Sequence, residues 1–286
     1  MNRSLHIISL LFLIGCSLSV EAQTDFFGNK APQDQQKKLS NPTINKPNKP
    51  NKVDAQGRRQ GEWGRKYANG NYAYTAFFVD GKPHGTVTRF AENGKKEAEI
   101  IYVEGNDTCK AILYGEKGNI EAKGQYVNEK KVGKWIIYND KDVVIGNESY
   151  VNGEYHGTQF YYFSDGKLRE TINYQNGIAH GAWNEFFHNG KKHTEATYKN
   201  GKLDGKFTVW NEDTGKIAAC GKYADDHQVG KWQMWDEFAK ETFFVSFDNN
   251  GNMTNPDEVQ KRMERKMQYY EEHKGSLQDP ATTIIQ

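Results

Sequence analysis

The feature that most constrains this chain is a motif that recurs every 24 residues, with one residue inserted near Asp213. A second glycine follows the leading position by four residues in seven of the eight copies, and Cys109 replaces it in the third. A repeat of this length is one supersecondary unit that buries its apolar surface only against neighbouring copies. The leading positions are Gly57, Gly81, Gly105, Glu129, Gly153, Gly177, Gly201 and Asp226.

Each copy reads as a β-hairpin. Turn pairs such as Asn93-Gly94 and Asn189-Gly190 lie between aromatic runs, and glycine accepts the positive φ that a tight turn requires. The second strand alternates, so that Ala98 and Ile100 face one way and Glu99 the other. The pattern predicts an all-β fold over residues 54–251: an elongated single antiparallel sheet of tandem hairpins, with one dry and one wet face.

The N-terminus predicts export. Residues 1–22 have a basic start at Arg3, a short apolar run and a small-residue cleavage site before Gln23, which is typical of a signal peptide. An alternative start is Cys16, because Leu13-Ile14-Gly15-Cys16 resembles a bacterial lipobox, with Cys16 as the lipidated residue. Both alternatives predict an exported chain, whether periplasmic, secreted or attached to the outer membrane, and only lipidation at Cys16 would tie it to a membrane.

Two segments flank the repeats. Residues 23–53 are rich in Pro, Asn, Gln and Lys and predict a disordered linker. In residues 252–286, Asn255-Pro256 is typical of a helix start, and Val259, Met263 and Met267 recur at helical spacing. Gly275 fits a helix stop. We expect a helix that caps the exposed edge of the last repeat, with a partner-binding helix as the alternative.

Charge and motifs exclude several classes of protein. The net charge of +1 does not favour nucleic acid. No short motif of a hydrolase, a metalloprotease or a phosphate-binding loop occurs, so we expect neither an enzyme nor a cofactor. Three histidines (His84, His156 and His180) share one repeat position, but copies about 9–10 Å apart are too distant to share a zinc ion. Cys109 and Cys220 lie four copies apart, and we expect half-buried thiols.

The aromatic residues are the candidates for binding. A Trp and a second aromatic residue lie three residues apart in the first strand of three copies, which places them on opposite faces of a regular strand. One set would then form a partly exposed ladder suited to a peptide or a glycan. A bulge or a strong twist that turns both sets inward is the alternative. The candidates are Trp63, Trp135, Trp183, Trp210, Trp232, Trp235, Tyr138 and Tyr162.

Segments such as Lys82-Pro83-His84-Gly85 and residues 174–183 resemble MORN repeats, in the bacterial variant form Asn-Gly-x-x-x-Gly-x-Trp-x-x-Tyr. The resemblance covers Asp54 to about Gly251 and implies a sheet of hairpins. It also implies scaffold functions, and bacterial members are often labelled antitoxin components of toxin–antitoxin modules. The chain departs from the pattern at Cys109, Glu129 and Asp226.

These observations together predict an exported, non-enzymatic repeat scaffold that binds a protein or an envelope polymer. An antitoxin or immunity-type inhibitor of a cognate toxin is one alternative, and a glycan-binding module that uses the aromatic ladder is another. The partner itself stays unknown at this point.

Overall fold

The computed structural model describes residues 51–102, 108–236 and 240–272. The predictions for the signal peptide, for Cys16, for most of the linker and for the tail that contains Gly275 lie outside the described residues. The described chain divides into two compact units, which meet in sequence between Gly166 and Lys167. Nothing in the repeat pattern predicts this division, because the turn at Gly166 resembles the turns of the other copies.

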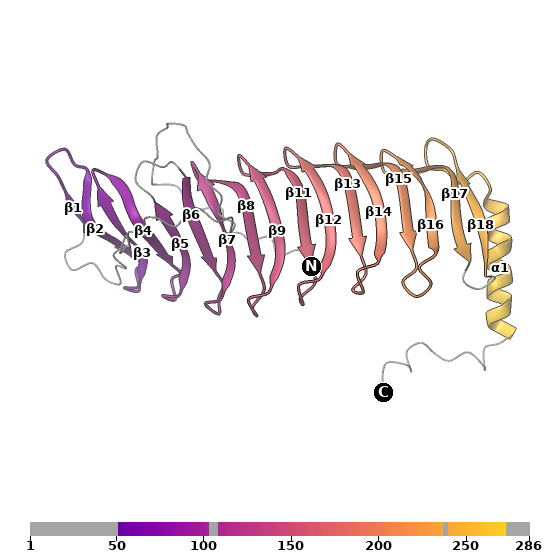
Figure 1. Cartoon of the computed structure of the whole chain (residues 1–286), viewed down its shortest axis with the longest axis horizontal. Coiled ribbons are helices and arrows are strands. Elements are labelled where there is room, and N and C mark those ends of the chain that lie inside the picture. The colour runs from indigo at the N-terminus through magenta and orange to yellow at the C-terminus, as the bar shows by residue number, and fades with distance from the viewer. Residues whose placement is uncertain (1–50, 103–107, 237–239, 273–286) are drawn as a thin grey trace, which may run out of the picture. The chain divides into compact units, whose positions relative to one another are not determined.

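Unit 1 is an antiparallel sheet in which successive strands are neighbours (Figure 1). At its end, β10 and β11 both pair with β9. The strands are β1 (Lys52–Val53), β2 (Arg59–Lys66), β3 (Tyr72–Val79), β4 (Lys82–Phe90), β5 (Lys96–Tyr102), β6 (Thr108–Tyr114), β7 (Ile120–Val127), β8 (Lys130–Tyr138), β9 (Val144–Val151), β10 (Glu154–Tyr155) and β11 (Gly157–Tyr162).

Unit 2 repeats the same antiparallel order and ends in a helix. The predicted antiparallel sheet of tandem hairpins is therefore confirmed in both units. The elements are β12 (Leu168–Gln175), β13 (Ile178–Phe186), β14 (Lys192–Lys199), β15 (Lys202–Trp210), β16 (Ile217–Ala224), β17 (His227–Asp236), β18 (Glu241–Phe247) and α1 (Pro256–Glu272).

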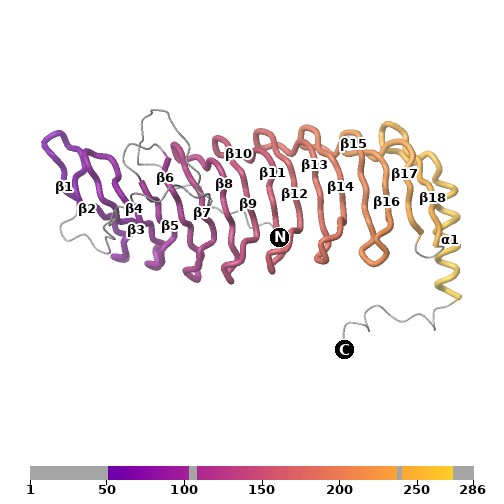
Figure 2. The backbone as a smooth tube through the Cα atoms, in the orientation of Figure 1, coloured from indigo at the N-terminus to yellow at the C-terminus, as the bar shows by residue number. Residues whose placement is uncertain are grey.

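The turns between copies, whose course Figure 2 traces, have a left-handed backbone, as the sequence predicts. At the junction of the fifth and sixth copies, Asn176 and Gly177 have φ of 51° and 77°. Two successive positive φ values are the signature of the tight turn whose twist matches that of the flanking strands. The junction also contacts the neighbouring copy, since the Gly201 N–H donates to the Ala179 carbonyl at 2.8 Å.

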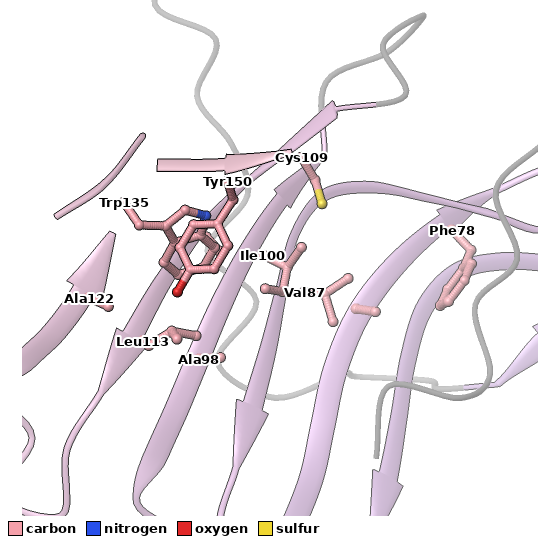
Figure 3. Close-up of a cluster of buried hydrophobic side chains, with 11 residues drawn as sticks. Phe78, Val87, Ala98, Ile100, Cys109, Leu113, Ala122, Trp135 and Tyr150 are labelled. Atoms are coloured by element: carbon pink, nitrogen blue, oxygen red, sulfur yellow. The ribbon is translucent and has the colours of Figure 1, made fainter. Parts of the chain in front are cut away.

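The buried hydrophobic side chains lie on one face of the sheet, which we call the core face; the opposite face is the open face. Figure 3 shows the buried cluster of unit 1. Alternation explains it, because Ala98 and Ile100 are buried whereas Glu99 between them points to the open face. The core-face cluster of unit 1 is Ala76, Phe78, Val87, Ala98, Ile100, Cys109, Ala111, Leu113, Ala122, Trp135 and Tyr150. In unit 2, Ile172, Ala196, Trp232 and Val245 are buried.

Helix α1 begins at Pro256, as predicted, but it covers the sheet edge differently from the expectation. The segment before it pairs with β18, where the Thr254 N–H donates to the Ser246 carbonyl at 2.7 Å. Arg262 then binds Glu241 at 2.6 Å and turns the polar side of α1 toward the sheet. Met263 and Met267 stay 63% and 61% exposed, so the apolar side of the helix does not cap the edge.

No helix among the described residues has both the length and the apolar character needed to cross a membrane.

Candidate binding surface

The core face of each unit contains one tryptophan that lies directly on a glycine. In unit 1, Trp135 of β8 covers Gly124 of β7, and a Cβ atom on Gly124 would overlap the indole ring. The indole Nε1 donates to the Gln125 carbonyl at 3.1 Å. Tyr126 and Tyr150 contact the ring edge-on, with centroids at 5.0 and 6.4 Å. We call this arrangement the Trp–Gly module.

Unit 2 builds the same module from β16 and β17. Trp232 covers Gly221, where a Cβ atom would again overlap the indole. Its Nε1 donates to the Lys222 carbonyl at 3.1 Å. Tyr223 and Phe247 flank the ring at 5.1 and 6.4 Å. The equivalent residues of two copies thus meet in the same geometry, because a large indole fits a close-packed strand pair only where the facing residue lacks a side chain.

These modules correct part of the predicted binding ladder. Trp135 and Trp232 are 0% and 1% exposed, so they cannot belong to an exposed binding face. Trp63 and Trp183 also lie on the core face, half-buried. Trp63 meets Phe78 edge-on at 6.0 Å, and the Trp183 Nε1 donates to Glu170 at 3.0 Å. Three of the four indoles face a small or apolar residue of the next strand, since Trp63 pairs with Ala76, Trp183 with Ala196 and Trp232 with Val245. Trp135 is instead opposite Glu148.

The second aromatic set lies on the open face and is half-buried. Tyr138 has the Lys123 ammonium 5.3 Å from its ring centroid, and the Tyr162 hydroxyl accepts a hydrogen bond from Asn147 at 2.9 Å. Lys123 and Asn147 alternate with buried core-face residues in their strands. Trp210 and Trp235 occupy the equivalent position in unit 2 and are also half-buried. A binding role for this row stays a prediction.

Each unit has a shallow cleft on the open face, between neighbouring copies. In unit 1 a cleft of about 410 Å³ is lined by Ile136, Val143, Val144, Asn147, Tyr162 and Gly166. In unit 2 a cleft of about 350 Å³ is lined by Lys167, Leu168, Phe186, His188, Asn189 and Gly190. Both lie against the open-face aromatic of the later copy. The cleft of unit 1 has largely apolar walls with two polar groups, Asn147 and the Tyr162 hydroxyl, which suits a side chain of a partner, whereas three of the six lining residues of the unit 2 cleft are polar.

Lysines form a second pattern on the open face, which the sequence analysis missed. The residue after the second glycine position is lysine in the third, fourth, seventh and eighth copies and not in the others. Comparing the copies at that single position would have found it. These lysines are Lys110 and Lys134 in unit 1, and Lys206 and Lys231 in unit 2. All four are exposed.

A polar network interrupts the core face at the end of unit 1, and it too was missed. The Glu148 carboxylate accepts hydrogen bonds from Tyr150 at 2.7 Å and Tyr155 at 2.9 Å, and Lys131 donates to the Tyr150 hydroxyl at 3.3 Å. Burial lowers the pKa of Lys131, while the Glu148 charge opposes the shift. Burial also raises the pKa of both tyrosines. The side chains satisfy one another, so the network serves the sheet.

Glu148 stands where most other copies have Ala, Gly, Ile or Val, and this departure is the sequence signal that would have located the network. Beside it, Gln159 replaces the Trp or apolar residue of the first strand and is 0% exposed. Its amide oxygen accepts from the Ser149 N–H at 2.6 Å. Polar groups buried in this way hold one register of the strands.

The histidines and cysteines do not gather into a site. Within the described parts of the chain, no group of three or more His, Cys, Asp or Glu residues could hold a metal ion. The His84 ring packs edge-on against the Phe77 ring, with the two ring centroids 6.4 Å apart. Cys109 is buried with its Sγ 3.7 Å from the Tyr126 carbonyl, and Cys220 is half-buried. Their packing matches the expectation of small, apolar side chains.

Comparison with known families gives one match. The model of the MORN repeat variant matches residues 83–104, 155–176 and 179–200. Three segments of the chain thus match MORN repeats of the variant type. The first MORN match covers nearly all of β4 and all of β5, and the third covers nearly all of β13 and all of β14. Each of these matches therefore spans two strands that pair with each other. The remaining copies follow the same 24-residue pattern.

No curated protein matches the chain. Among solved structures it is similar to a mutant of S. aureus TarM in complex with fondaparinux, α-GlcNAc-glycerol and UDP. The identity is 12%, the match covers 42% of this chain and 19% of that chain, and the TM-score is 0.21. A similarity this slight carries no argument about fold or activity.

Proposed function

We propose that the chain is a non-enzymatic scaffold that binds a protein partner through its open face. The cleft of unit 1 carries this proposal, because it combines a volume of about 410 Å³ with apolar walls at Ile136 and Val144 and one amide at Asn147. Small clefts of this kind accept side chains of a partner, and the polar group fixes their orientation. The half-buried row of aromatics extends the contact area on the same face.

A glycan is less well supported as the partner. Stacking on a sugar requires an exposed ring face, and Lys123 and Lys216 already lie over the rings of Tyr138 and Trp235. A protein partner instead uses the clefts between copies and the polar groups beside them. Contact of this kind concentrates binding energy in a few residues.

The test is a substitution in the cleft with a matched control. Ile136→Glu places a charge in the cleft, whereas Ile112→Glu makes the same change at the same repeat position in β6, away from both clefts. The chain from Gln23 onward serves as bait for an envelope extract, and the captured protein is then titrated by calorimetry. Ile136→Glu is expected to weaken binding about tenfold or more, and Ile112→Glu to leave it near the wild-type value. Equal affinities for all three chains would refute the cleft as the binding site.

We further propose that the chain is exported, on the basis of residues 1–22. Cell fractionation and the intact mass of the recovered chain test this. A mass that begins at Gln23 identifies a cleaved signal peptide, and a mass that begins at a diacylated Cys16 identifies a lipoprotein. A full-length chain recovered from the cytoplasm would overturn export.

A further inference from the structure

The open face of the unit 2 module carries three lysines on three adjacent strands. Lys206 in β15 stands directly opposite Lys222 in β16, and Lys231 follows in β17. All three are exposed. We call them the lysine triad. Like charges directly opposite each other destabilise a strand pair, so the sheet bears a cost here that an anionic partner would remove.

The face to which the side chains of the lysine triad point follows from the residues next to them in sequence, which lie on the core face. Phe207, Tyr223 and Trp232 contact one another on that face, with ring centroids 5.1 to 5.8 Å apart. Each follows its lysine by one residue, and successive side chains in a strand point to opposite faces. The buried module therefore fixes the triad on the open face. The outermost strands, β15 and β17, lie about 9–10 Å apart.

No acid neutralises the triad from within its own strand segments. Residues 206–210, 220–222 and 231–235 contain no Asp or Glu. Within the described residues, none of the three lysines forms an ion pair; the Lys231 ammonium instead lies 3.7 Å from the Phe244 ring centroid. Glu195 in the neighbouring strand β14 interacts electrostatically with Lys206, but it also binds Lys192 at 2.5 Å. The triad is thus a concentrated positive charge on a chain whose net charge is only +1.

We propose that the lysine triad binds an acidic segment of a protein partner, with Asp or Glu side chains spaced to reach Lys206 and Lys231. The proposal rests on the proposed function, since it takes the open face as the binding surface. One turn of an extended polyproline-type helix rises about 9.3 Å over three residues, close to the spacing of β15 and β17. An acid at every third residue would therefore meet successive lysines.

Two features favour a peptide over a phosphate polymer or a sulfated glycan. The triad contains no arginine, the side chain that matches phosphate and sulfate oxygens in bidentate fashion. Four residues beyond Lys206 and Lys231 stand Trp210 and Trp235, with Thr208 and Gln233 between. Thr208 is buried, so β15 offers a positive charge and a half-buried aromatic, and β17 adds the half-buried Gln233 between them. This mixture suits the varied side chains of a peptide better than a uniform polyanion.

Unit 1 supplies a natural control for this inference. Its module presents Lys110, Gln125 and Lys134 at the positions of Lys206, Lys222 and Lys231. Gln125→Lys would create a second triad without touching the core face, because only the Gln125 carbonyl bonds to Trp135. At these three positions the two units therefore differ only in the central residue, which raises the number of lysines from two in unit 1 to three in unit 2.

The experiment titrates the full chain with a labelled peptide of repeated Glu-Pro-Pro triplets, followed by fluorescence anisotropy and by calorimetry. Lys222→Glu is expected to weaken binding about tenfold. Lys261→Glu, the same charge change on exposed α1, is expected to leave binding unchanged, and Gln125→Lys to raise the stoichiometry from one peptide to two. Circular dichroism confirms that each variant is folded.

Three outcomes would overturn the proposal. Lys222→Glu and Lys261→Glu could weaken the peptide equally, which would mean that only net charge matters. Polyphosphate or heparin could bind more tightly than the peptide and lose affinity in Lys222→Glu, which would identify a general anion site. Finally, Ile136→Glu could weaken binding of the captured partner while Lys222→Glu leaves it unchanged. This result would support the proposed function and refute binding of an acidic segment at the lysine triad.

Discussion

The two Trp–Gly modules are nearly identical on the core face and different on the open face. Trp135 on Gly124 and Trp232 on Gly221 make the same indole hydrogen bond, at 3.1 Å in both units. On the other side of the same strands, unit 1 has Gln125 where unit 2 has Lys222. Packing restricts the core face, since an indole needs a glycine beneath it. Side chains on the open face point to solvent and are not restricted by packing in this way. The copies therefore differ in side-chain chemistry on the open face.

The largest expected effect tests whether the modules are equivalent in stability. Trp135→Ala and Trp232→Ala each remove a buried indole and are expected to destabilise their own unit by about 3–5 kcal/mol. Urea unfolding followed by circular dichroism measures the loss, and hydrogen exchange with mass spectrometry assigns it to a unit. A loss below about 1 kcal/mol in either variant would show that the module does not hold that unit together.

A second test addresses the glycine beneath each indole. Gly124→Ala and Gly221→Ala place a methyl group inside the ring volume and are expected to cost about 1–3 kcal/mol through overpacking. Gly146→Ala is the control, because its Cβ would meet Ile137 at 3.3 Å and needs only a small shift. Adding Trp135→Phe to Gly124→Ala should recover part of the loss, as expected for residues in contact. Simple additivity of the two changes would contradict the close approach.

The strand two positions before each module, β5 in unit 1 and β14 in unit 2, offers a pH test. Burial raises the pKa of Glu99, but hydrogen bonds from Lys96 and Tyr114 outweigh it and hold the pKa below its usual value. In unit 2, Lys192 alone binds the equivalent Glu195 and lowers its pKa. A carboxyl with a lowered folded-state pKa stabilises the fold above its unfolded pKa, here 4.5, and this contribution is lost as the pH falls through the folded-state value.

Glu99→Gln is therefore expected to lower the urea midpoint at pH 7 and to lose this difference from wild type progressively as the pH falls below 4.5. Glu195→Gln should show the same trend with a smaller amplitude, because its side chain is 44% exposed against 22% for Glu99. The measurement is the urea midpoint of the wild type and of both variants across this pH range. A Glu99→Gln difference that grows on acidification would reverse the assigned sign.

The smallest expected effect concerns the turn that joins the two strands of each module. Glu129 and Asp226 hold φ of 65° and 70° where other junctions use glycine. Glu129→Gly should stabilise unit 1 by about 1 kcal/mol, because glycine adopts this conformation without a Cβ clash. Asp226→Gly should gain less, since the Asp226 carboxylate accepts the Leu203 N–H at 2.7 Å. Thermal unfolding of both variants compares them, and an equal gain would show that this hydrogen bond contributes nothing.

Much of the fold could be predicted from the sequence for a local reason. Hairpin turns depend on residues such as Asn93-Gly94 that accept a left-handed backbone wherever they occur. The alternation around Glu99 likewise requires only a regular strand. The helix start at Pro256 was predicted on the same basis. Its packing was not, because Arg262 and its acidic partners come together only after β17 and β18 have formed.

The candidate site was predicted less well. The spacing of three residues correctly separated Tyr138 from Trp135, but it could not say which set would be buried. That choice depends on Gly124, which is eleven residues before Trp135 in the sequence and lies under its indole ring in the sheet. The lysine triad was missed for the same reason, since its members are remote in sequence and adjacent only across strands.

The sequence by itself determined the repeat, the hairpins and the two-sided character of the strands, because these follow from turn chemistry and from a side-chain period of two. Tertiary structure alone decided which aromatic face is buried, where the clefts lie, and that Lys206, Lys222 and Lys231 stand together. Cross-strand register decides all three, and register brings together side chains that the linear chain keeps 9 to 25 residues apart.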